Sequence, residues 1–494
     1  MADLKKISVL IFTIILSIIF PFQFINNQTA FSKQKGGDAS MKRLSECEFI
    51  KWFDPDTKEE EGKLLLKNCS ECHMQYYKEW KNDKHSMSQN NPFFLSIYKQ
   101  FKQDLPDKNG NCALCHNPEA AVSIDSVNVD AGIKSNGISC DFCHKIESVD
   151  QNSLKTGTAG LKVARAVLKK KIIFNSDLSD DISCEGLKDI RFGPIKNPVQ
   201  PGKNEELRYN SLYKTSLYCA KCHDGSNGNV QIYSTFTEWV NSPAAKKGVQ
   251  CQSCHMVPRR EATMGHLYAI VDNPNVKHKT RPYHEIHGHS FLTENPHEFR
   301  KKYMNLIIEM HRRHVSMMQD EILIVTCKVE NNNSGHNFPT GSPMRNAILL
   351  VEAKDENGNN LKLIKGERLP NYAGDLRNKP GKLFAKILSE TSGEYGMKHS
   401  EEGIKFRKFA KEFGIPAQDW WNVFVINDSR IKPNEDDIST YEFAVETPQR
   451  GVSKKGTITA RLIWRNTWPG LAKLKGVKLE EDLLLEKVIS LRTN

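Results

Sequence analysis

Five short segments between residues 69 and 255 carry two cysteines separated by two residues and followed at once by a histidine. With this spacing, two thiols can bond to the two vinyl groups of one porphyrin while the adjacent imidazole binds the iron. Zinc sites and redox disulfides also use paired cysteines, but neither requires a histidine directly after the second one. The pattern therefore predicts five covalently attached c-type haems.

The predicted attachment residues are ten cysteines and five proximal histidines. The thiols are Cys69, Cys72, Cys112, Cys115, Cys140, Cys143, Cys219, Cys222, Cys251 and Cys254. The proximal iron ligands are His73, His116, His144, His223 and His255. Three cysteines remain, Cys47, Cys184 and Cys327. In an oxidising compartment two of them could pair, or all three could stay free, and the sequence leaves both alternatives open.

The residue on the other face of each iron decides what that iron can do. A second histidine closes the iron for electron transfer, whereas an open position permits substrate binding. The candidates for this distal position are His85, His266, His284, His289 and His336. His85 follows the first motif closely, and His336 lies in a glycine- and proline-shaped turn between two predicted strands.

The chain has 494 residues, 38% of them hydrophobic, and a formal net charge of +11. Scattered lysines carry most of this charge, and no basic run is interleaved with aromatic residues, so the composition argues against a nucleic-acid partner. The charge indicates a solvated surface, or a surface that docks an acidic redox partner.

The N-terminus has the features of an export signal. Lys5 and Lys6 precede an apolar run over residues 7–20, which ends at Pro21. Residues 1–30 are therefore predicted to be a cleaved signal peptide or an N-terminal membrane anchor, followed by a linker over residues 31–45. Haem is joined to these motifs outside the cytoplasm in bacteria. We expect the protein in the periplasm or on the outer face of the cytoplasmic membrane, with an extracellular location left open.

The remaining chain predicts an α+β protein. Residues 46–297 are expected to form a haem-packed domain with short helices and little regular structure. Residues 298–320 are expected to form a connecting helix, because Tyr303, Leu306, Met310 and His314 fall on one helical face. Residues 321–494 are expected to form a β-sandwich-like domain.

Alternating residues predict strands over 322–329, 346–353, 440–445 and 457–464, with a turn at 355–358. A further strand is predicted near 171–174, in a long insertion between the third and fourth motifs, and residues 397–422 read as helical or irregular. The short gaps between motifs suggest two haem pairs, the second with the third and the fourth with the fifth.

Several segments resemble the multihaem cytochrome c superfamily of cytochrome c-552/4-like proteins, related to tetrahaem carriers, pentahaem nitrite reductases and hydroxylamine oxidoreductases. Glu79-Trp80 followed by His85 resembles its distal-ligand motif. The segments 192–194, 219–224, 248–256, 284–288 and 335–341 resemble further family elements. The resemblance covers residues 65–465 and implies a haem protein of electron transfer or multihaem redox catalysis.

One departure from this pattern is informative. Glu238-Trp239 echoes Glu79-Trp80, but Ala244 stands where the histidine would be. Either a downstream histidine such as His284 replaces it, which is the favoured alternative, or one iron is open.

The favoured function is electron transfer between redox partners, such as other redox proteins or a membrane quinol-linked complex, in an anaerobic-type respiratory chain. The alternative is an oxidoreductase that acts on a small nitrogen or sulfur compound at one open haem. All five motifs end in histidine, whereas pentahaem nitrite reductases usually carry lysine at the catalytic haem. A role as the haem subunit of an oligomer or filament is compatible with electron transfer.

Overall fold

The computed structural model describes residues 48–49, 69–123, 130–173, 181–200, 205–258, 267–271, 279–314, 321–390, 423–445 and 456–491, apart from gaps of one to four residues. The chain divides into two compact units, Met1–Cys47 and Glu48–Asn494. All described residues belong to the second unit. The predicted export signal, the linker, Cys47, His266 and the segment 397–422 lie outside them.

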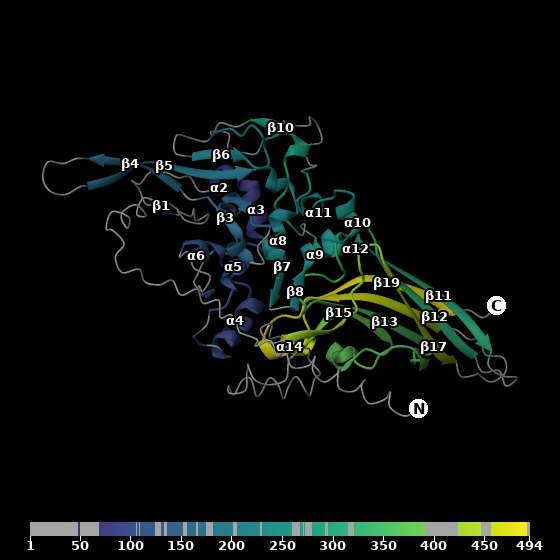
Figure 1. Ribbon diagram of the computed structural model, residues 1–494. Helices are drawn as coiled ribbons and strands as arrows, with labels where there is room; N and C mark the ends of the chain where they lie inside the picture. The colour runs from purple at the N-terminus through teal and green to yellow at the C-terminus, as the bar shows by residue number, and fades with distance from the viewer. Residues whose placement is uncertain are drawn as a thin grey trace, which may run out of the picture. The chain divides into compact units, whose positions relative to one another are not determined.

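The region of the motifs consists of short helices joined by loops, as expected (Figure 1). The helices are α2 (Cys69–Cys72), α3 (Met74–Lys81), α4 (Pro92–Asp104), α5 (Ala113–His116), α6 (Pro118–Ser123), α7 (Cys140–His144), α8 (Leu217–His223), α9 (Thr235–Val240), α10 (Pro243–Lys246) and α11 (Cys251–His255). Four 3-10 turns occur among the described residues: Gly157–Gly160, Ser211–Lys214, Tyr283–Glu285 and Asn371–Leu376.

Small sheets accompany these helices. The long insertion between the third and fourth motifs forms a sheet in the order β1-β4-β5-β6, with the strands Glu48–Phe49, Ala166–Ile173, Asp181–Gly193 and Glu205–Tyr209. This confirms a strand near 171–174. Three two-stranded pairs are β2 (Ile146–Val149) with β3 (Leu161–Val163), β7 (Asp224–Asn227) with β8 (Val230–Ser234), and β9 (Leu267–Ala269) with β10 (Thr280–Pro282).

The C-terminal part is rich in strands. One sheet has the order β11-β12-β17-β14, with the strands Met304–His314, Glu321–Asn331, Asp436–Val445 and Lys362–Lys365. The other has the order β16-β15-β13-β18-β19, with the strands Val423–Asp428, Gly381–Glu390, Asn346–Asp355, Gly456–Arg465 and Glu481–Leu491. A helix, α14 (Pro469–Lys475), precedes the last strand.

One hydrophobic core joins the two sheets. Leu323, Val325 and Val329 of β12 alternate inward and pack in the same cluster as Leu349 of β13 and Leu462 of β18. Inward alternation on both sheets is the packing of a β-sandwich. The four strands predicted in this part of the chain are therefore confirmed.

The predicted connecting helix over 298–320 is wrong. Among the described residues of this stretch, only Pro296–Lys301 is helical (α12), and Met304–His314 forms β11, paired antiparallel with β12. Met304 and Leu306 are buried, whereas Ile307 is 39% exposed, as a period of two requires. The residues that share a helical face also fit alternation, and the neighbouring strand β12 decides between the two patterns.

Candidate functional site: the haem-binding motifs

Each Cys-x-x-Cys-His motif folds into about one turn of helix. α2, α5, α7, α8 and α11 each contain at least one cysteine of their motif, and the proximal histidine ends the helix or directly follows it. Residues three apart lie on the same face of a helix, so both thiols of a motif can reach one porphyrin. A continuous cavity of about 2550 Å³ is lined by residues of all five motifs.

Backbone carbonyls orient three of the proximal imidazoles. The Nδ1 atom of His116 lies 2.9 Å from the carbonyl oxygen of Ser88. The Nδ1 atoms of His144 and His255 lie 2.8 Å and 2.7 Å from the carbonyl oxygens of Phe192 and Phe291, respectively. A carbonyl oxygen only accepts a hydrogen bond, so Nδ1 carries the proton and Nε2 keeps its lone pair. Metal-binding histidines are held by the same arrangement.

The burial of these rings also sets their charge. Burial lowers the pKa of His116, His144 and His255 below 6.5, and it lowers the pKa of His223 to about 3. These imidazoles are therefore neutral at pH 7. Neutral imidazole is the form that binds a metal ion.

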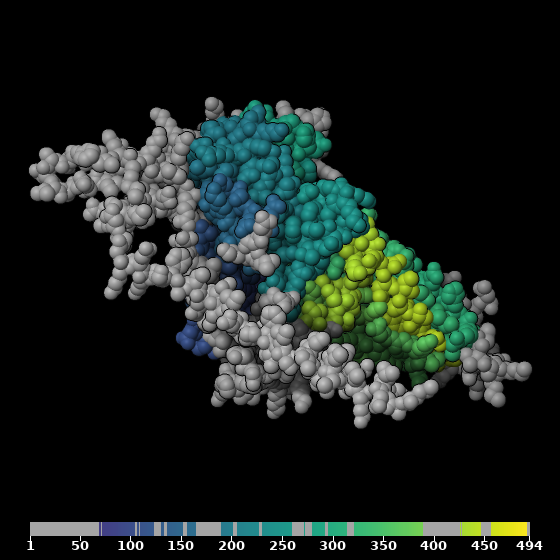
Figure 2. Space-filling view, in the orientation of Figure 1, coloured from purple at the N-terminus to yellow at the C-terminus, as the bar shows by residue number. Residues whose placement is uncertain are grey.

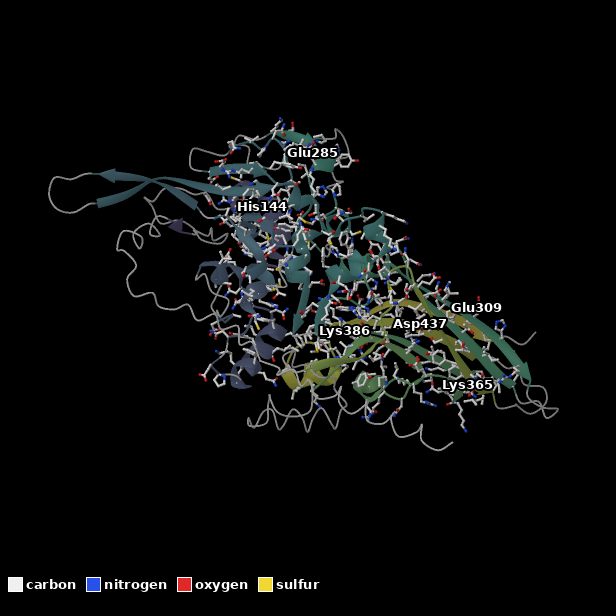
Figure 3. All side chains as sticks on the ribbon, in the orientation of Figure 1. His144, Glu285, Glu309, Lys365, Lys386 and Asp437 are labelled. Atoms are coloured by element: carbon white, nitrogen blue, oxygen red, sulfur yellow. The ribbon has the colours of Figure 1, made fainter. Side chains whose placement is uncertain are left out.

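Three proximal rings face a second histidine ring at similar separations. The ring centres are 6.2 Å apart for His144 and His289, and 6.1 Å apart for His223 and His85. They are 6.3 Å apart for His255 and His336. An imidazole nitrogen binds a metal ion at about 2 Å. Two rings on opposite faces of one iron therefore have centres roughly 6 Å apart. The residues present therefore fit the haem groups that the motifs imply (His144 is labelled in Figure 3).

His85 differs from the other oriented histidines because a carboxylate holds it. Its Nδ1 lies 2.6 Å from Oδ1 of Asp83, and that oxygen also accepts the His85 backbone N–H at 2.8 Å. Burial would raise the pKa of Asp83, but the hydrogen bonds from His85 outweigh it and lower the pKa below 3.8. The ring of Phe291 packs edge-on against His85 at 4.3 Å.

His336 occupies the place beside Ala244 where the second Glu-Trp segment lacks a histidine. A side chain added at Gly335 would contact Trp239 and Ala244, so the turn that carries His336 lies directly on this segment. The predicted replacement, His284, is exposed in the Tyr283–Glu285 turn, with its ring against Tyr283. No described proximal ring lies near it at the spacing seen in the three pairs.

The first two motifs are arranged differently. Tyr76 lies between His73 and His289, with ring centres 6.2 Å and 4.5 Å away, respectively. Phe94 stacks on the face of His116 at 3.9 Å. Within the described part of the chain, no histidine ring is positioned across from His116.

Thiols of different motifs lie side by side. Cys69 contacts Cys140, Cys115 contacts Cys222, and Cys219 contacts Cys251. The first motif therefore adjoins the third, the second adjoins the fourth, and the fourth adjoins the fifth. Of the two pairings that the gap lengths suggested, the fourth with the fifth is observed, while the second motif contacts the fourth rather than the third.

An arginine of the sandwich points into the cavity without a carboxylate. Arg345 is exposed and lines the cavity, and its Nη1 donates to the Thr340 carbonyl oxygen at 3.0 Å. No described acidic residue forms an ion pair with it, so it suits a haem propionate. Sequence reasoning missed Arg345 and Asp83; only the closeness of Asp83 to a predicted ligand could have indicated it.

The remaining cysteines carry no described bond. Cys327 is a free thiol buried in the core of the sandwich. Cys47 lies outside the described residues and nothing is described of the Cys184 side chain, so their pairing stays a prediction.

Comparison with known proteins agrees with this geometry. Residues 68–145 and 196–256 match the family described as cytochrome c554 and c-prime. A penta-heme cytochrome c552 from Thermochromatium tepidum superposes with a TM-score of 0.53 at 18% identity, covering 86% of this chain and 97% of that chain. The X-ray structure of Northeast Structural Genomics Consortium target SoR45 covers 38% of this chain and 84% of its own at 8% identity, and its TM-score of 0.16 supports no common fold. No curated protein matches the chain.

The five attachment motifs, the neutral and oriented imidazoles and this family match over residues 68–145 and 196–256 together support a multihaem c-type cytochrome.

Proposed function

We propose that the protein is an exported pentahaem c-type cytochrome that transfers electrons between redox partners in an anaerobic-type respiratory chain. The observation that carries this proposal is the set of three histidine pairs at 6.1–6.3 Å. Haem c supplies a one-electron couple whose iron, with histidine on both faces, has no site for a substrate.

The residues around these pairs support the same reading. Thiol contacts join the first motif to the third, and the fourth motif to both the second and the fifth. The Tyr218 hydroxyl, in the helix of the fourth motif, donates to the Cys143 carbonyl oxygen of the third at 2.9 Å, so the attachment sites are continuous. Such a chain of sites suits electron entry at one end and exit at another.

The proposed partners are other redox proteins or a membrane quinol-linked complex, reached from the periplasm or the outer face of the cytoplasmic membrane. The apolar segment over residues 7–20 supports export, either as a cleaved signal or as an anchor. None of the helices that the structure describes is long and apolar enough to cross a membrane. Assembly into an oligomer or filament is compatible with this function.

A second candidate function is an oxidoreductase acting on a small nitrogen or sulfur compound. Its support is His116, which no described histidine ring faces. One open iron at the second motif would admit such a substrate.

Spectroscopy of the purified ferric protein separates the two functions. A fully low-spin spectrum that does not respond to cyanide, nitrite or hydroxylamine is expected of the carrier. A high-spin signal from one haem in five, with turnover of nitrite or hydroxylamine, would establish the oxidoreductase instead. Mass spectrometry is expected to find five added haems, and fewer would refute the pentahaem proposal.

The ligand assignments have a separate test. Replacing His85 or His336 by alanine is expected to convert one low-spin haem to high-spin. An unchanged spectrum would remove that residue from the set of ligands.

A further inference from the structure

Two Glu-Trp pairs each lie in the next helix after a haem-binding motif. Glu79-Trp80 lies in α3, after the first motif, and Glu238-Trp239 lies in α9, after the fourth. Only the first pair is followed by a histidine at the fifth position after the tryptophan. The second pair must therefore have a role that does not depend on that histidine.

The two tryptophans make the same contact. Nε1 of Trp80 donates to the carbonyl oxygen of Ile138 at 2.8 Å, and Nε1 of Trp239 donates to that of Val249 at 2.9 Å. Ile138 stands two residues before Cys140, and Val249 stands two residues before Cys251. Each tryptophan thus fixes the chain where it enters a motif helix, of the third motif in one case and of the fifth in the other.

Each glutamate bonds to the backbone at, or directly beside, the histidine that faces the same motif. Oε2 of Glu79 accepts the backbone N–H of His289 at 2.7 Å, and His289 faces His144. Oε2 of Glu238 accepts the backbone N–H of Asn337 at 3.1 Å, beside His336, which faces His255.

We infer that each Glu-Trp pair is a clamp that holds the proximal motif and the distal histidine of one haem at a fixed separation. Glu79-Trp80 positions the third-motif site, and Glu238-Trp239 positions the fifth-motif site. This inference rests on the proposed axial roles of His289 and His336.

The surroundings fit this role at both places. A backbone N–H bonded to an ionised carboxylate is held more strongly than one bonded to a neutral acceptor. Glu79 is itself held by the Gln75 amide at 3.3 Å. Glu238 is held by Arg430 at 2.6 Å and by Thr340 at 2.6 Å, so the clamp also fastens the sandwich to the haem-binding region. Lys386, labelled in Figure 3, adds to this junction through Ser234 at 2.8 Å. Figure 2 shows the teal surface of the haem-binding region adjoining the green and yellow surface of the sandwich.

The test uses Glu79→Ala and Glu238→Ala in the full haem-loaded protein, with His289→Ala and His336→Ala as references. Cyanide binding to the ferric protein measures how often a distal position opens, and electron paramagnetic resonance identifies the haem affected. Each glutamate variant is expected to raise cyanide binding by about tenfold at its own site only, from the loss of one charge-assisted hydrogen bond. Mass spectrometry is expected to find the haem number unchanged.

Conservative variants guard against a failure to fold. Glutamine keeps an uncharged acceptor oxygen, so Glu79→Gln and Glu238→Gln are expected to give intermediate cyanide binding and serve if the alanine variants do not accumulate. Lys78→Ala changes an exposed residue of the same helix and leaves the bond to His289 in place, so its cyanide binding is expected to stay within about twofold of the parent.

The outcomes distinguish the clamp from the axial assignment. If the histidine variants open their sites while the glutamate variants bind cyanide like the parent, the clamp is refuted and the axial ligands stand. If the histidine variants leave the spectrum unchanged, the axial assignment fails, and the clamp fails with it.

Discussion

Replacement of Asp83 by asparagine is expected to raise the reduction potential of one haem, the one whose proposed axial ligands are His223 and His85. Asp83 is buried, and its carboxylate accepts the Nδ1–H of His85 at 2.6 Å. His116, His144 and His255 instead donate to neutral backbone carbonyls. A carboxylate acceptor makes the imidazole a stronger electron donor, which stabilises ferric over ferrous iron.

The magnitude follows from the strength of this hydrogen bond. A hydrogen bond to a charged group contributes about 1.5–3 kcal/mol and a neutral one about 0.5–1.5 kcal/mol, so the substitution removes about 1–1.5 kcal/mol. For a one-electron couple, 1.4 kcal/mol corresponds to about 59 mV. If the loss falls mainly on the oxidised state, the midpoint rises by roughly 40–65 mV.

Spectroelectrochemical titration measures this shift, and electron paramagnetic resonance checks that the ligand field of a single haem has changed. Asp224→Asn is the matched control, because Asp224 directly follows His223 but bonds to Thr237 rather than to an imidazole. It removes a nearby charge without altering an axial ligand. An Asp83→Asn protein with unmoved potentials, or with all potentials shifted alike, would refute the reasoning.

Two further predictions concern stability. Lys145→Met is expected to destabilise the fold by about 3–5 kcal/mol, because it removes the cation that lies 2.8 Å from the buried Asp141 carboxylate and 3.1 Å from that of Asp189. Chemical denaturation measures the free energy of unfolding, and a loss below about 1 kcal/mol would contradict this expectation. Burial would raise the pKa of Glu238, but Arg430 and two hydroxyl donors lower it below 4.5. The stabilisation by Glu238 is therefore complete above pH 4.5 and is lost as the pH falls through the lowered pKa. The midpoint temperature of thermal unfolding, measured from pH 7 to pH 3, should fall with this loss. In Glu238→Gln the midpoint temperature should depend less on pH, and equal acid sensitivity of both proteins would argue against the role of Glu238.

The cofactor and the attachment residues could be predicted from the sequence because covalent attachment demands a fixed local spacing. The sequence also singled out His85 and His336 as candidate ligands, since each stands in a recognisable local segment, and the structure places both opposite proximal rings. The choice of His289 over His284 was not, because both belong to one cluster and only the backbone contact with Glu79 distinguishes them. Long-range contacts of this kind leave no periodic signal in the chain.

The same limit explains the two errors. Residues 304–314 satisfy both the helical and the alternating pattern, and pairing with β12 decides in favour of a strand. Motif spacing along the chain suggested that the second motif pairs with the third, but a loop of any moderate length can bring distant motifs together at small entropic cost. The contact between Cys115 and Cys222 spans the longest gap between motifs.

The position of His336 links maturation of the cofactor sites to folding of the sandwich. All attachment cysteines precede residue 255, whereas His336 lies about eighty residues later, between β12 and β13. As the chain is synthesised from its N-terminus, the fifth motif becomes available before the domain that completes its coordination has folded. In the proposed arrangement, the spin state at this motif therefore reports whether the C-terminal domain has docked, and a truncated or misfolded product would reveal itself by one coordinatively unsaturated iron.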